Sequence, residues 1–245
     1  MSKTIFTYSK HKMWIVWWFS FSCLFVIPMA WTTLVAFCCF QGLGVVITYH
    51  RYYAHKSFEF KNPVIKWLFT YFAVMGGQGS PMIWTAVHKM HHKHTDTEQD
   101  PHSPIHGLLR GFFVPTFEPW DLRMVVSMAR DQYQVFFHQY YLFIILLTWV
   151  VSYLLGMPQV IQGTALALLS TNAGNYLGHM IGYKNFETKS LDTNHWFVAL
   201  IFFGDGWHNN HHHNPSKFTT QVKWWEFDIA GFVIKHILAD KTTLK

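Results

Sequence analysis

Two long tracts of this sequence carry no charged side chain. No Asp, Glu, Lys or Arg occurs from Met13 to Tyr49 or from Gln132 to Tyr183. A helix crosses the hydrocarbon core of a bilayer with about 20 apolar residues, so each tract is long enough for two spans. Over the whole chain only 13% of residues are charged, whereas soluble domains average about 25%. These patterns predict a polytopic membrane protein.

Helix-breaking residues divide each tract into a predicted hairpin. Pro28 ends the first helix, and the uncharged turn Gly156–Gln159 separates the last two. The four predicted spans are residues 13–28, 32–49, 140–155 and 160–181. Lysines precede the first span, and Lys and Arg side chains follow the second. By the positive-inside rule, both termini and the charged segments lie on the cytoplasmic side.

Two shorter apolar segments are not predicted to cross. Residues 67–87 are uncharged, but Gly76–Pro81 would break a helix there. A crossing would also place His88 on the opposite side of the membrane from His50, so we expect this segment to dip into the bilayer or lie along its interface. The aromatic run Trp224–Phe227 is typical of a helix that lies on the lipid headgroups.

Two pentads share the pattern His-x-x-His-His, at residues 88–92 and 208–212. Offsets of three and four bring side chains onto one face of a helix, and imidazole is the commonest neutral nitrogen ligand of zinc, iron and copper. With three further histidines they supply nine candidate ligands: His50, His55, His88, His91, His92, His179, His208, His211 and His212. One metal takes at most about six ligands, so nine indicate two metals. An incidental histidine run is the alternative for one pentad, but two pentads in one chain argue against it.

Two other pairs of candidate residues have spacings that predict local structure. His50 and His55 are five residues apart, a rotation of about 140° on an α-helix, so we expect the helix to end or bend there. Asn175 and His179 are four apart and share one face of the predicted fourth span. A polar pair at that depth is costly and by default indicates function. The alternative is that Asn175 forms interhelical hydrogen bonds beside Asn172.

Several polar residues lie close in sequence to the candidate ligands. Asp205 precedes His208 by three residues, and Asp96 follows His92 by four. Ligating imidazoles usually donate their second N–H to a carboxylate or a carbonyl. A solvated surface position is the alternative for each such residue. Those predicted to support the ligands are Asp96, Asp100, Asn194 and Asp205.

The ligand set is rich in neutral nitrogen and poor in carboxylate. A structural zinc ion needs only four ligands, and neither pentad contains the His-Glu-x-x-His pattern of hydrolytic zinc enzymes. A pair of irons that activates O2 fits better, with an alkyl chain reached from the bilayer as substrate. The net charge of +6 does not indicate nucleic acid, because the basic residues flank apolar spans and would contact membrane lipid headgroups.

The predicted fold is an all-α membrane protein, with four transmembrane helices in two hairpins and a cytosolic helical cap that holds the two metals. Residues 50–139 and 182–245 form the cap, and residues 1–245 form a single domain. A histidine-rich metal transporter is a rival from another class. It would need carboxylates inside the membrane, and the two uncharged tracts contain none.

The histidine pattern resembles the three histidine boxes of integral-membrane fatty acid desaturases. The boxes are His50-x-x-x-x-His55, His88-x-x-His91-His92 and His208-x-x-His211-His212. The similarity extends from residue 13 to about residue 230. Flanking strings resemble the delta-9 type: His50-Arg51-Tyr52-Tyr53-Ala54-His55, Asp100-Pro101-His102-Ser103-Pro104, Asn175-x-x-x-His179 and Gly204-Asp205-Gly206-Trp207.

The resemblance implies four spans and a cytosolic cap, with two irons held by nine histidines and one water-mediated contact at Asn175. It also implies a bent, narrow tunnel for an acyl chain, and O2 as co-substrate. The expected product carries a cis double bond at the delta-9 position, with electrons supplied by ferredoxin or cytochrome b5. Zinc would replace iron in overexpressed protein by ligand preference alone. A hydroxylase or ketolase uses the same scaffold and is the nearest alternative.

Four residues depart from the pattern of acyl-CoA desaturases. Ala86-Val87 stand where those enzymes commonly carry Arg-Asp, Lys89 replaces the usual Arg, and Asp205 replaces the usual Glu. The first change removes a contact to the thioester carrier. Together with the Asp100–Pro104 string, it resembles the acyl-lipid branch, so we expect a lipid-linked acyl substrate, with acyl-CoA as the alternative.

Overall fold

The computed structural model describes residues 10–108 and 125–245. Within these ranges the chain is helical, and three isolated bridges are its only β-type pairings, one of which joins Phe60 to Ala239. The predicted all-α class is therefore confirmed for the described residues. Residues 1–9 and the predicted cap segment 109–124 lie outside them.

The first predicted hairpin contains two helices. α1 (Lys10–Val26) is followed by α2 (Trp31–Phe37), which continues without a break into the π-helix η2 (Cys38–Ala54). The second helix thus ends at Ala54 rather than at the predicted residue 49. The reason is hydrogen bonding across five residues, since the His55 N–H donates to the His50 carbonyl oxygen at 3.1 Å.

Length and hydropathy identify fewer spans than the four predicted. Among the described residues, the 24-residue helix Trp31–Ala54 is long and apolar enough to cross a membrane. α6 (Gln132–Gln139) and α7 (Tyr141–Leu154) are bent by 67° at their junction and give a second candidate only if they form one broken span. α1 is an apolar helix of shorter length.

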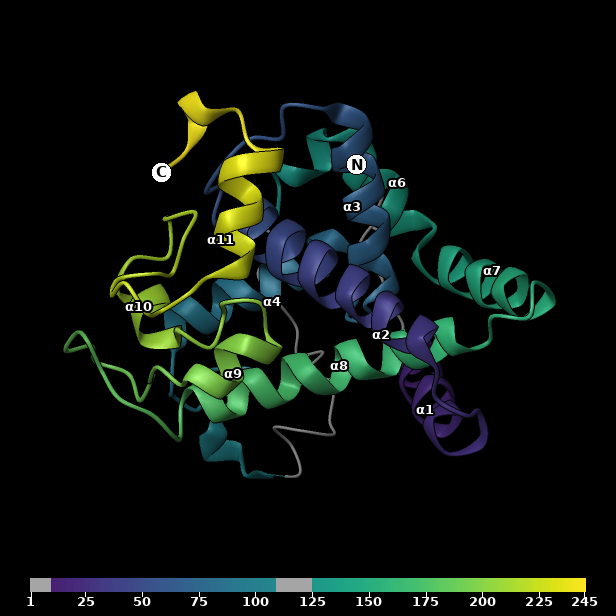
Figure 1. The fold of residues 1–245 in the computed structure, drawn as a ribbon, viewed down its shortest axis with the longest axis horizontal. Coiled ribbons are helices and arrows are strands. Elements are labelled where there is room, and N and C mark those ends of the chain that lie inside the picture. The colour runs from purple at the N-terminus through teal and green to yellow at the C-terminus, as the bar shows by residue number, and fades with distance from the viewer. Residues whose placement is uncertain (1–9, 109–124) are drawn as a thin grey trace.

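α7 and α8 (Gln159–Gly178) form the second hairpin, close to the predicted residues 140–155 and 160–181. α8 packs against α2 through small residues, because a Cβ added at Gly163 would lie 2.4 Å from the Cβ of Ala36. Thr33 Oγ1 donates a hydrogen bond of 2.8 Å to Gln162 Oε1 between the same helices. In Figure 1, α8 runs lengthwise below α2, and α1 and α7 project at one end.

The predicted helix break at Gly76–Pro81 is confirmed. α3 (Pro63–Met75) ends before it, and α4 (Pro81–His94) begins within it. Gly77 and Gly79 have φ angles of +75° and +96°, which residues with a Cβ rarely adopt. α4 then packs beside η2, which brings the first histidine pentad next to the first histidine pair.

The segment Trp224–Phe227 forms a turn, and the remaining described helices are short. The prediction of an interfacial helix at Trp224–Phe227 is wrong, because the Glu226 carboxylate accepts the backbone N–H groups of Val222 and Lys223 at 3.0 and 2.8 Å and folds this segment into a turn. The short elements are η3 (Pro104–His106), η5 (Met128–Arg130), α9 (Trp196–Ile201), α10 (His208–His213), α11 (Ile229–Val233), η6 (Ile234–Leu238) and η7 (Lys241–Thr243).

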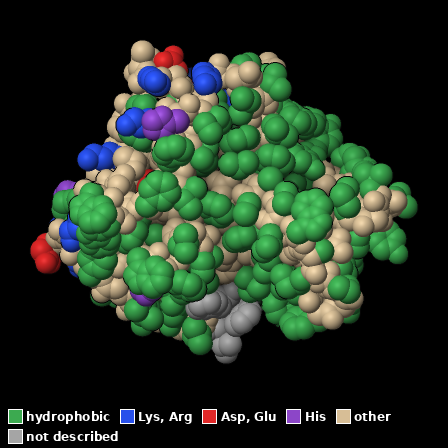
Figure 2. Space-filling view, viewed as in Figure 1, with side chains coloured by type: hydrophobic (Ala, Val, Ile, Leu, Met, Phe, Trp, Pro, Cys, Tyr) green, Lys and Arg blue, Asp and Glu red, His purple; other side chains and the backbone are tan. Residues whose placement is uncertain are grey.

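Buried side chains form two hydrophobic clusters. One includes Tyr53 and Ile234 and joins η2 to η6, and the other includes Val16 and Ile145 and joins α1 to α7. Hydrophobic side chains also cover the surface at the end formed by α1 and α7, whereas charged side chains gather at the opposite end, around α10 and the C-terminus (Figure 2). On α7, Tyr153 is 68% exposed. Such exposed apolar surface is typical of lipid contact.

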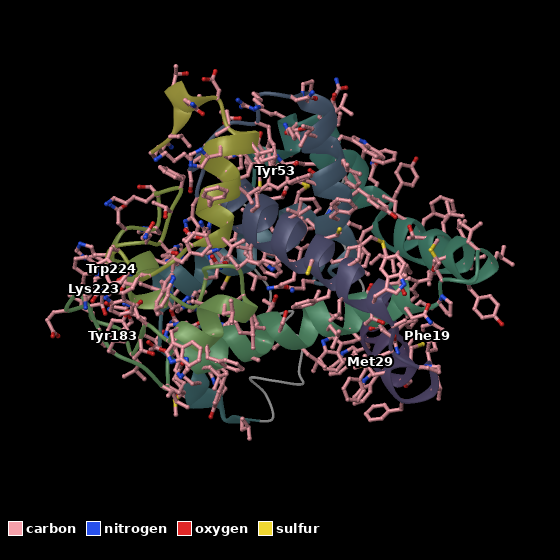
Figure 3. All side chains as sticks on the ribbon, viewed as in Figure 1. Phe19, Met29, Tyr53, Tyr183, Lys223 and Trp224 are labelled. Carbon is pink, nitrogen blue, oxygen red and sulfur yellow. The ribbon has the colours of Figure 1, made fainter. Side chains whose placement is uncertain are left out.

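Individual side chains also lie at these two ends of the molecule. Figure 3 places Phe19 and Met29 at the end that carries α1, and Tyr183, Lys223 and Trp224 at the other end. Lys223 Nζ lies 5.0 Å from the centre of the Tyr183 ring, a cation–π distance. The charged end also carries α10, and therefore the second histidine pentad.

Candidate metal centre

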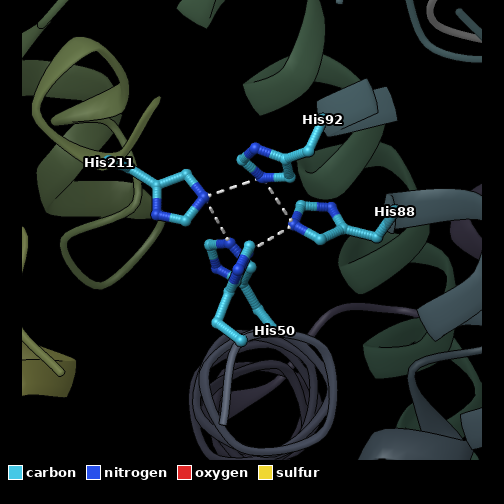
Figure 4. Close-up of side chains that lie close together, drawn as sticks. His50, His88, His92 and His211 are labelled. Carbon is cyan, nitrogen blue, oxygen red and sulfur yellow. Dashed lines mark hydrogen bonds between the residues drawn. The ribbon is translucent and has the colours of Figure 1, made fainter. Parts of the chain in front are cut away.

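The nine candidate histidines lie in two adjacent clusters, within each of which the ligand atoms are all within 4.8 Å of one another. In Figure 4 the labelled rings of His50, His88, His92 and His211 lie around a common centre. The five-histidine cluster consists of His50, His55, His88, His92 and His211. The four-histidine cluster consists of His91, His179, His208 and His212.

The π-helix explains how the first histidine pair reaches one cluster. In a π-helix the N–H of residue i+5 donates to the carbonyl oxygen of residue i, so two residues separated by five positions lie about one turn from each other and point in similar directions. The centres of the His50 and His55 rings are accordingly only 4.8 Å from each other. We expected the helix to end or bend at this pair. It ends at Ala54, but the shared direction of the two rings comes from the π-type hydrogen bonding before that end.

Each pentad contributes to both clusters. On α4, His88 and His92 belong to the five-histidine cluster and His91 to the four-histidine cluster. On α10 the division is reversed, since His208 and His212 belong to the four-histidine cluster and His211 to the other. The two clusters meet where the rings of His92 and His212 stack, with 4.5 Å between their centres. Two metals bound there would be neighbours.

The Nε2 atom of each of the nine rings lies close to the Nε2 atom of another ring in the same cluster. The Nδ1–H of His50 donates to Asp205 Oδ2 at 2.7 Å, so in the neutral ring Nε2 carries a lone pair. That nitrogen lies 3.0 Å from Nε2 of His211. Nitrogen lone pairs that converge in this way are accommodated by a cation, so these residues fit a metal.

The four-histidine cluster has the same arrangement. Nδ1 of His91 donates to Asp100 at 2.9 Å, and Nδ1 of His179 donates to Asp96 at 3.1 Å. Nε2 of His179 then lies 3.0 Å from Nε2 of His208. Both clusters therefore contain rings whose outer nitrogen is fixed by a carboxylate and whose inner nitrogen faces the cluster centre.

Burial keeps most of these imidazoles neutral. In six of the nine histidines the pKa is lowered well below the ordinary value of 6.5, because burial disfavours the charged ring and neighbouring histidines add repulsion. A neutral imidazole is the form that binds a metal. The histidines with this shift are His55, His88, His92, His208, His211 and His212.

The structure pairs the carboxylates differently from their sequence neighbours. Asp205 contacts His50, not His208, and Asp96 contacts His179, not His92. The reason is that η2 and α8 approach these carboxylates in space, which no local spacing records.

Asp100 and Asn194 complete the predicted set. Burial opposes ionisation of Asp100, but its hydrogen bond and attraction to His91 lower its pKa to about 2. The pKa of Asp205 is likewise lowered, against the effect of burial, by His50 and Arg51. Asn194 contacts Asn210 of the third box, whose backbone N–H it accepts at 3.2 Å. Its amide also donates to the Asn210 side chain at 2.9 Å, so Asn194 holds α10 in place.

A cavity lies beside the clusters. Asn175 lines it together with His208 and Asp205, as do apolar groups of Val45 and Phe202. The same cavity is lined by His50 and His88 of the five-histidine cluster, so Asn175 shares it with rings of both clusters. A second cavity continues from the first, because Trp84 and Thr171 line both.

Polar side chains at the junction of the two cavities were missed in the sequence. Trp84 Nε1 donates to Gln78 Oε1 at 2.8 Å, and Thr171 Oγ1 donates to Gln41 Oε1 at 3.0 Å. Gln78 and Thr171 are also hydrogen bonded to each other. The available signal was that Gln41 and Thr171 are polar residues inside the two uncharged tracts. Together these side chains fix the Trp84 indole in the cavity wall.

Comparison with known proteins agrees with this arrangement. A family model described as fatty acid desaturase matches residues 25–243. Delta-9 acyl-lipid desaturase 2 of Arabidopsis thaliana is 34% identical over 223 residues, which cover 84% of this chain and 70% of that protein. The sn-1 stearoyl-lipid 9-desaturase of Anabaena variabilis is 32% identical over 83% of this chain and 79% of its own length. Acyl-CoA 5-desaturase AL21 of Anemone leveillei is 30% identical over 84% and 67%, respectively.

Proposed function

The chain belongs to the fatty acid desaturase family of oxidoreductases, and we propose that it inserts a cis double bond at the delta-9 position of a saturated, lipid-linked acyl chain. The observation that carries this proposal is the convergence of nine imidazole Nε2 atoms on two centres beside two adjoining cavities. An alkyl chain in these cavities would lie next to both centres.

We propose that the five-histidine and four-histidine clusters each hold one iron. Asn175 would contact one of these irons through a water. Bound iron would supply the oxidation of an unactivated C–H bond with O2, chemistry that no side chain performs alone. Neutral nitrogen ligands and few carboxylates support iron rather than magnesium or calcium. Zinc, which the same ligands bind, is expected as a contaminant of overexpressed protein.

The residues of the chain would position the substrate. The aromatic and apolar side chains Trp17, Ile83 and Leu168 line the second cavity, which no cluster histidine lines, and would exclude water from an alkyl chain. The Trp84 indole, held by Gln78, lies between this cavity and the clusters. It would thus determine which carbon–carbon bond faces the metals.

We propose four membrane spans, formed by α1, by α2 with η2, by α7 and by α8, with both termini and all histidine boxes on the cytoplasmic side. The two uncharged tracts support this arrangement, as does the hydrophobic surface over α1 and α7. Residues 50–139 and 182–245 would form the cap of a single domain, and the segment containing α3 and α4 would not cross.

The carrier of the acyl chain is proposed from sequence. Ala86 and Val87 are apolar and, with Asp100–Pro104, resemble the acyl-lipid branch. Two of the relatives named above are acyl-lipid or stearoyl-lipid desaturases, and one is an acyl-CoA desaturase. Acyl-CoA is therefore the alternative carrier. Ferredoxin or cytochrome b5 is proposed as a separate electron donor.

Expression in a host of known lipid composition tests the proposal. We expect new delta-9 monoenes in the fatty acid methyl esters, produced only with O2, and esterified to lipid rather than to CoA at early times. A His88→Ala variant is the matched control and should produce none. Hydroxy or keto fatty acids would reject desaturation in favour of a hydroxylase or ketolase. Tightly bound zinc without iron and without any oxygen-dependent product would instead support a metal transporter.

A further inference from the structure

Arg51 follows a candidate ligand directly in sequence and is 2% exposed. Its Nη2 donates to Asp205 Oδ1 at 2.9 Å. The other oxygen of that carboxylate, Oδ2, accepts the Nδ1–H of His50 at 2.7 Å. One carboxylate therefore bridges the guanidinium and the imidazole. The Asp205 side chain is 19% exposed and lines the cavity beside the clusters.

The opposite side of the guanidinium is held by the C-terminal part of the chain. Nη1 of Arg51 donates to Asp228 Oδ2 at 2.7 Å and to the Phe218 carbonyl oxygen at 2.8 Å. Asp228 is 3% exposed and is itself fixed, since it accepts the backbone N–H groups of Thr220 at 2.8 Å and Gly231 at 2.9 Å. The second of these bonds caps the N-terminus of α11.

The other carboxylates that contact cluster histidines are held in a different way. Asp100 accepts the backbone N–H groups of Asp96 and His102, both at 2.9 Å. Asp96 accepts the backbone N–H group of Leu191 at 2.7 Å. Backbone donors therefore hold both of these carboxylates. Asp205 depends instead on a side chain whose other anchor is 177 residues away in sequence from Arg51.

We propose that Arg51 and Asp228 are positioning residues for the metal at the five-histidine cluster. Asp228 holds Arg51, Arg51 holds Asp205, and Asp205 holds the His50 ring with Nε2 toward the cluster centre. This inference rests on the proposed metal site. It assigns to the segment 218–231 a role in metal binding, although that segment contains none of the candidate ligands.

Charge and geometry both support this role. A buried guanidinium needs ionic partners, and here it has two carboxylates in a forked arrangement that lysine cannot reproduce. Without the guanidinium, Asp205 and Asp228 would be two partly or fully buried carboxylates without their shared cation. Asp205 would then be free to rotate away from His50, and the ring would lose its fixed orientation.

Two substitutions in the full-length protein, purified with iron, test the proposal. Arg51→Lys keeps a charge but loses the fork. Asp228→Asn keeps the helix cap, because asparagine caps as well as aspartate, but removes the charge that holds Arg51. Asp240→Asn is the matched control, since Asp240 is an exposed aspartate that caps η7 in the same way. The readouts are iron per chain during competition with a chelator, and the electronic spectrum of the iron.

We expect both test variants to release one of two irons at a chelator concentration on the order of 10–100-fold lower than the wild type, as is typical for loss of a group that orients a ligand. The iron spectrum should change, and Asp240→Asn should match the wild type. Wild-type affinity and spectrum for both irons in Asp228→Asn would overturn the inference, even if Arg51→Lys fails to fold. A wild-type protein that binds no iron would instead overturn the proposed function on which the inference rests.

Discussion

The rings of His50 and His55 lie with their centres 4.8 Å apart although the residues are five positions apart on one helix. In an α-helix this offset would turn the two side chains about 140° away from each other. The π-type hydrogen bond from the His55 N–H to the His50 carbonyl oxygen removes that rotation. Both histidines can therefore serve one metal without a bend in the helix.

Insertion of one alanine between Tyr53 and Ala54 tests this relationship. The added residue would rotate His55 away from His50 and leave the five-histidine cluster without one ring. We expect loss of desaturase activity and of one iron per chain, measured by product analysis and metal analysis. One alanine inserted between Gly156 and Met157, in the exposed turn after α7, is the control. Full activity of the first insertion would show that the register of η2 is not needed.

Neighbouring histidines on α4 should differ sharply in their effect. His91 faces His212 through Nε2 at 3.3 Å and belongs to the four-histidine cluster, whereas His94 on the same helix is in neither cluster. His91→Ala should lower turnover more than about 100-fold and reduce bound iron, because it removes a ligand that Asp100 also orients. His94→Ala should retain activity and iron. Equal effects of the two substitutions would contradict the assignment of ligands.

The metal-free protein should lose stability in mild acid. Six cluster imidazoles have pKa values lowered well below 6.5 by burial, so the unfolded chain binds protons first as the pH falls. Their contribution is complete above about pH 6.5 and decreases below it, by up to about 1.4 kcal/mol per imidazole and pH unit. The carboxylates with lowered pKa values, such as Asp100, act in the same direction but only below about pH 4.

Thermal unfolding of the chelator-treated protein between pH 7.5 and 5.5 measures this effect. The melting temperature should change little between pH 7.5 and about 6.5 and should fall from there to pH 5.5, and iron should abolish most of the dependence because bound metal keeps the ligands deprotonated. A melting temperature that does not change with pH would contradict neutral, buried imidazoles.

The polar junction between the two cavities should control where the double bond forms. Gln78→Leu removes the acceptor of the Trp84 N–H and a partner of Thr171, while it keeps a similar volume. We expect the bound iron to be unchanged and the mixture of double-bond positions to broaden, measured by mass spectrometry of derivatised fatty acids. Gln221→Leu, at an exposed position, is the control. An unchanged single product would show that Trp84 is held by packing alone.

Much of the fold could be predicted from the distribution of charge. The uncharged tracts and their helix breakers gave the bounds of α1, α7 and α8 to within a few residues. They did not give the end of η2, which continues to Ala54, since π-type hydrogen bonding left no signal in the pattern. The aromatic run at Trp224 was misread because the role of Glu226 in closing a turn depends on contacts with Tyr183 and Asn210, which are distant in sequence.

The candidate site divides in the same way. Spacing was enough to select the nine histidines that the structure brings together. It also selected three carboxylates that contact these histidines, but not which ring each one contacts, because Asp205 meets His50 across 155 positions and Asp96 meets His179 across 83. Arg51 and Asp228 were not singled out at all. Each is an ordinary charged residue in the sequence, and only burial and the shared guanidinium reveal their role.

The most direct test of the account is the number and environment of the irons in the purified full-length protein, measured by metal analysis with Mössbauer and X-ray absorption spectroscopy on the same sample. Two irons per chain, each in a shell dominated by imidazole nitrogen, are expected. One iron or none under iron-replete expression, or a shell dominated by carboxylate oxygen, would contradict a pair of metals held by these nine histidines.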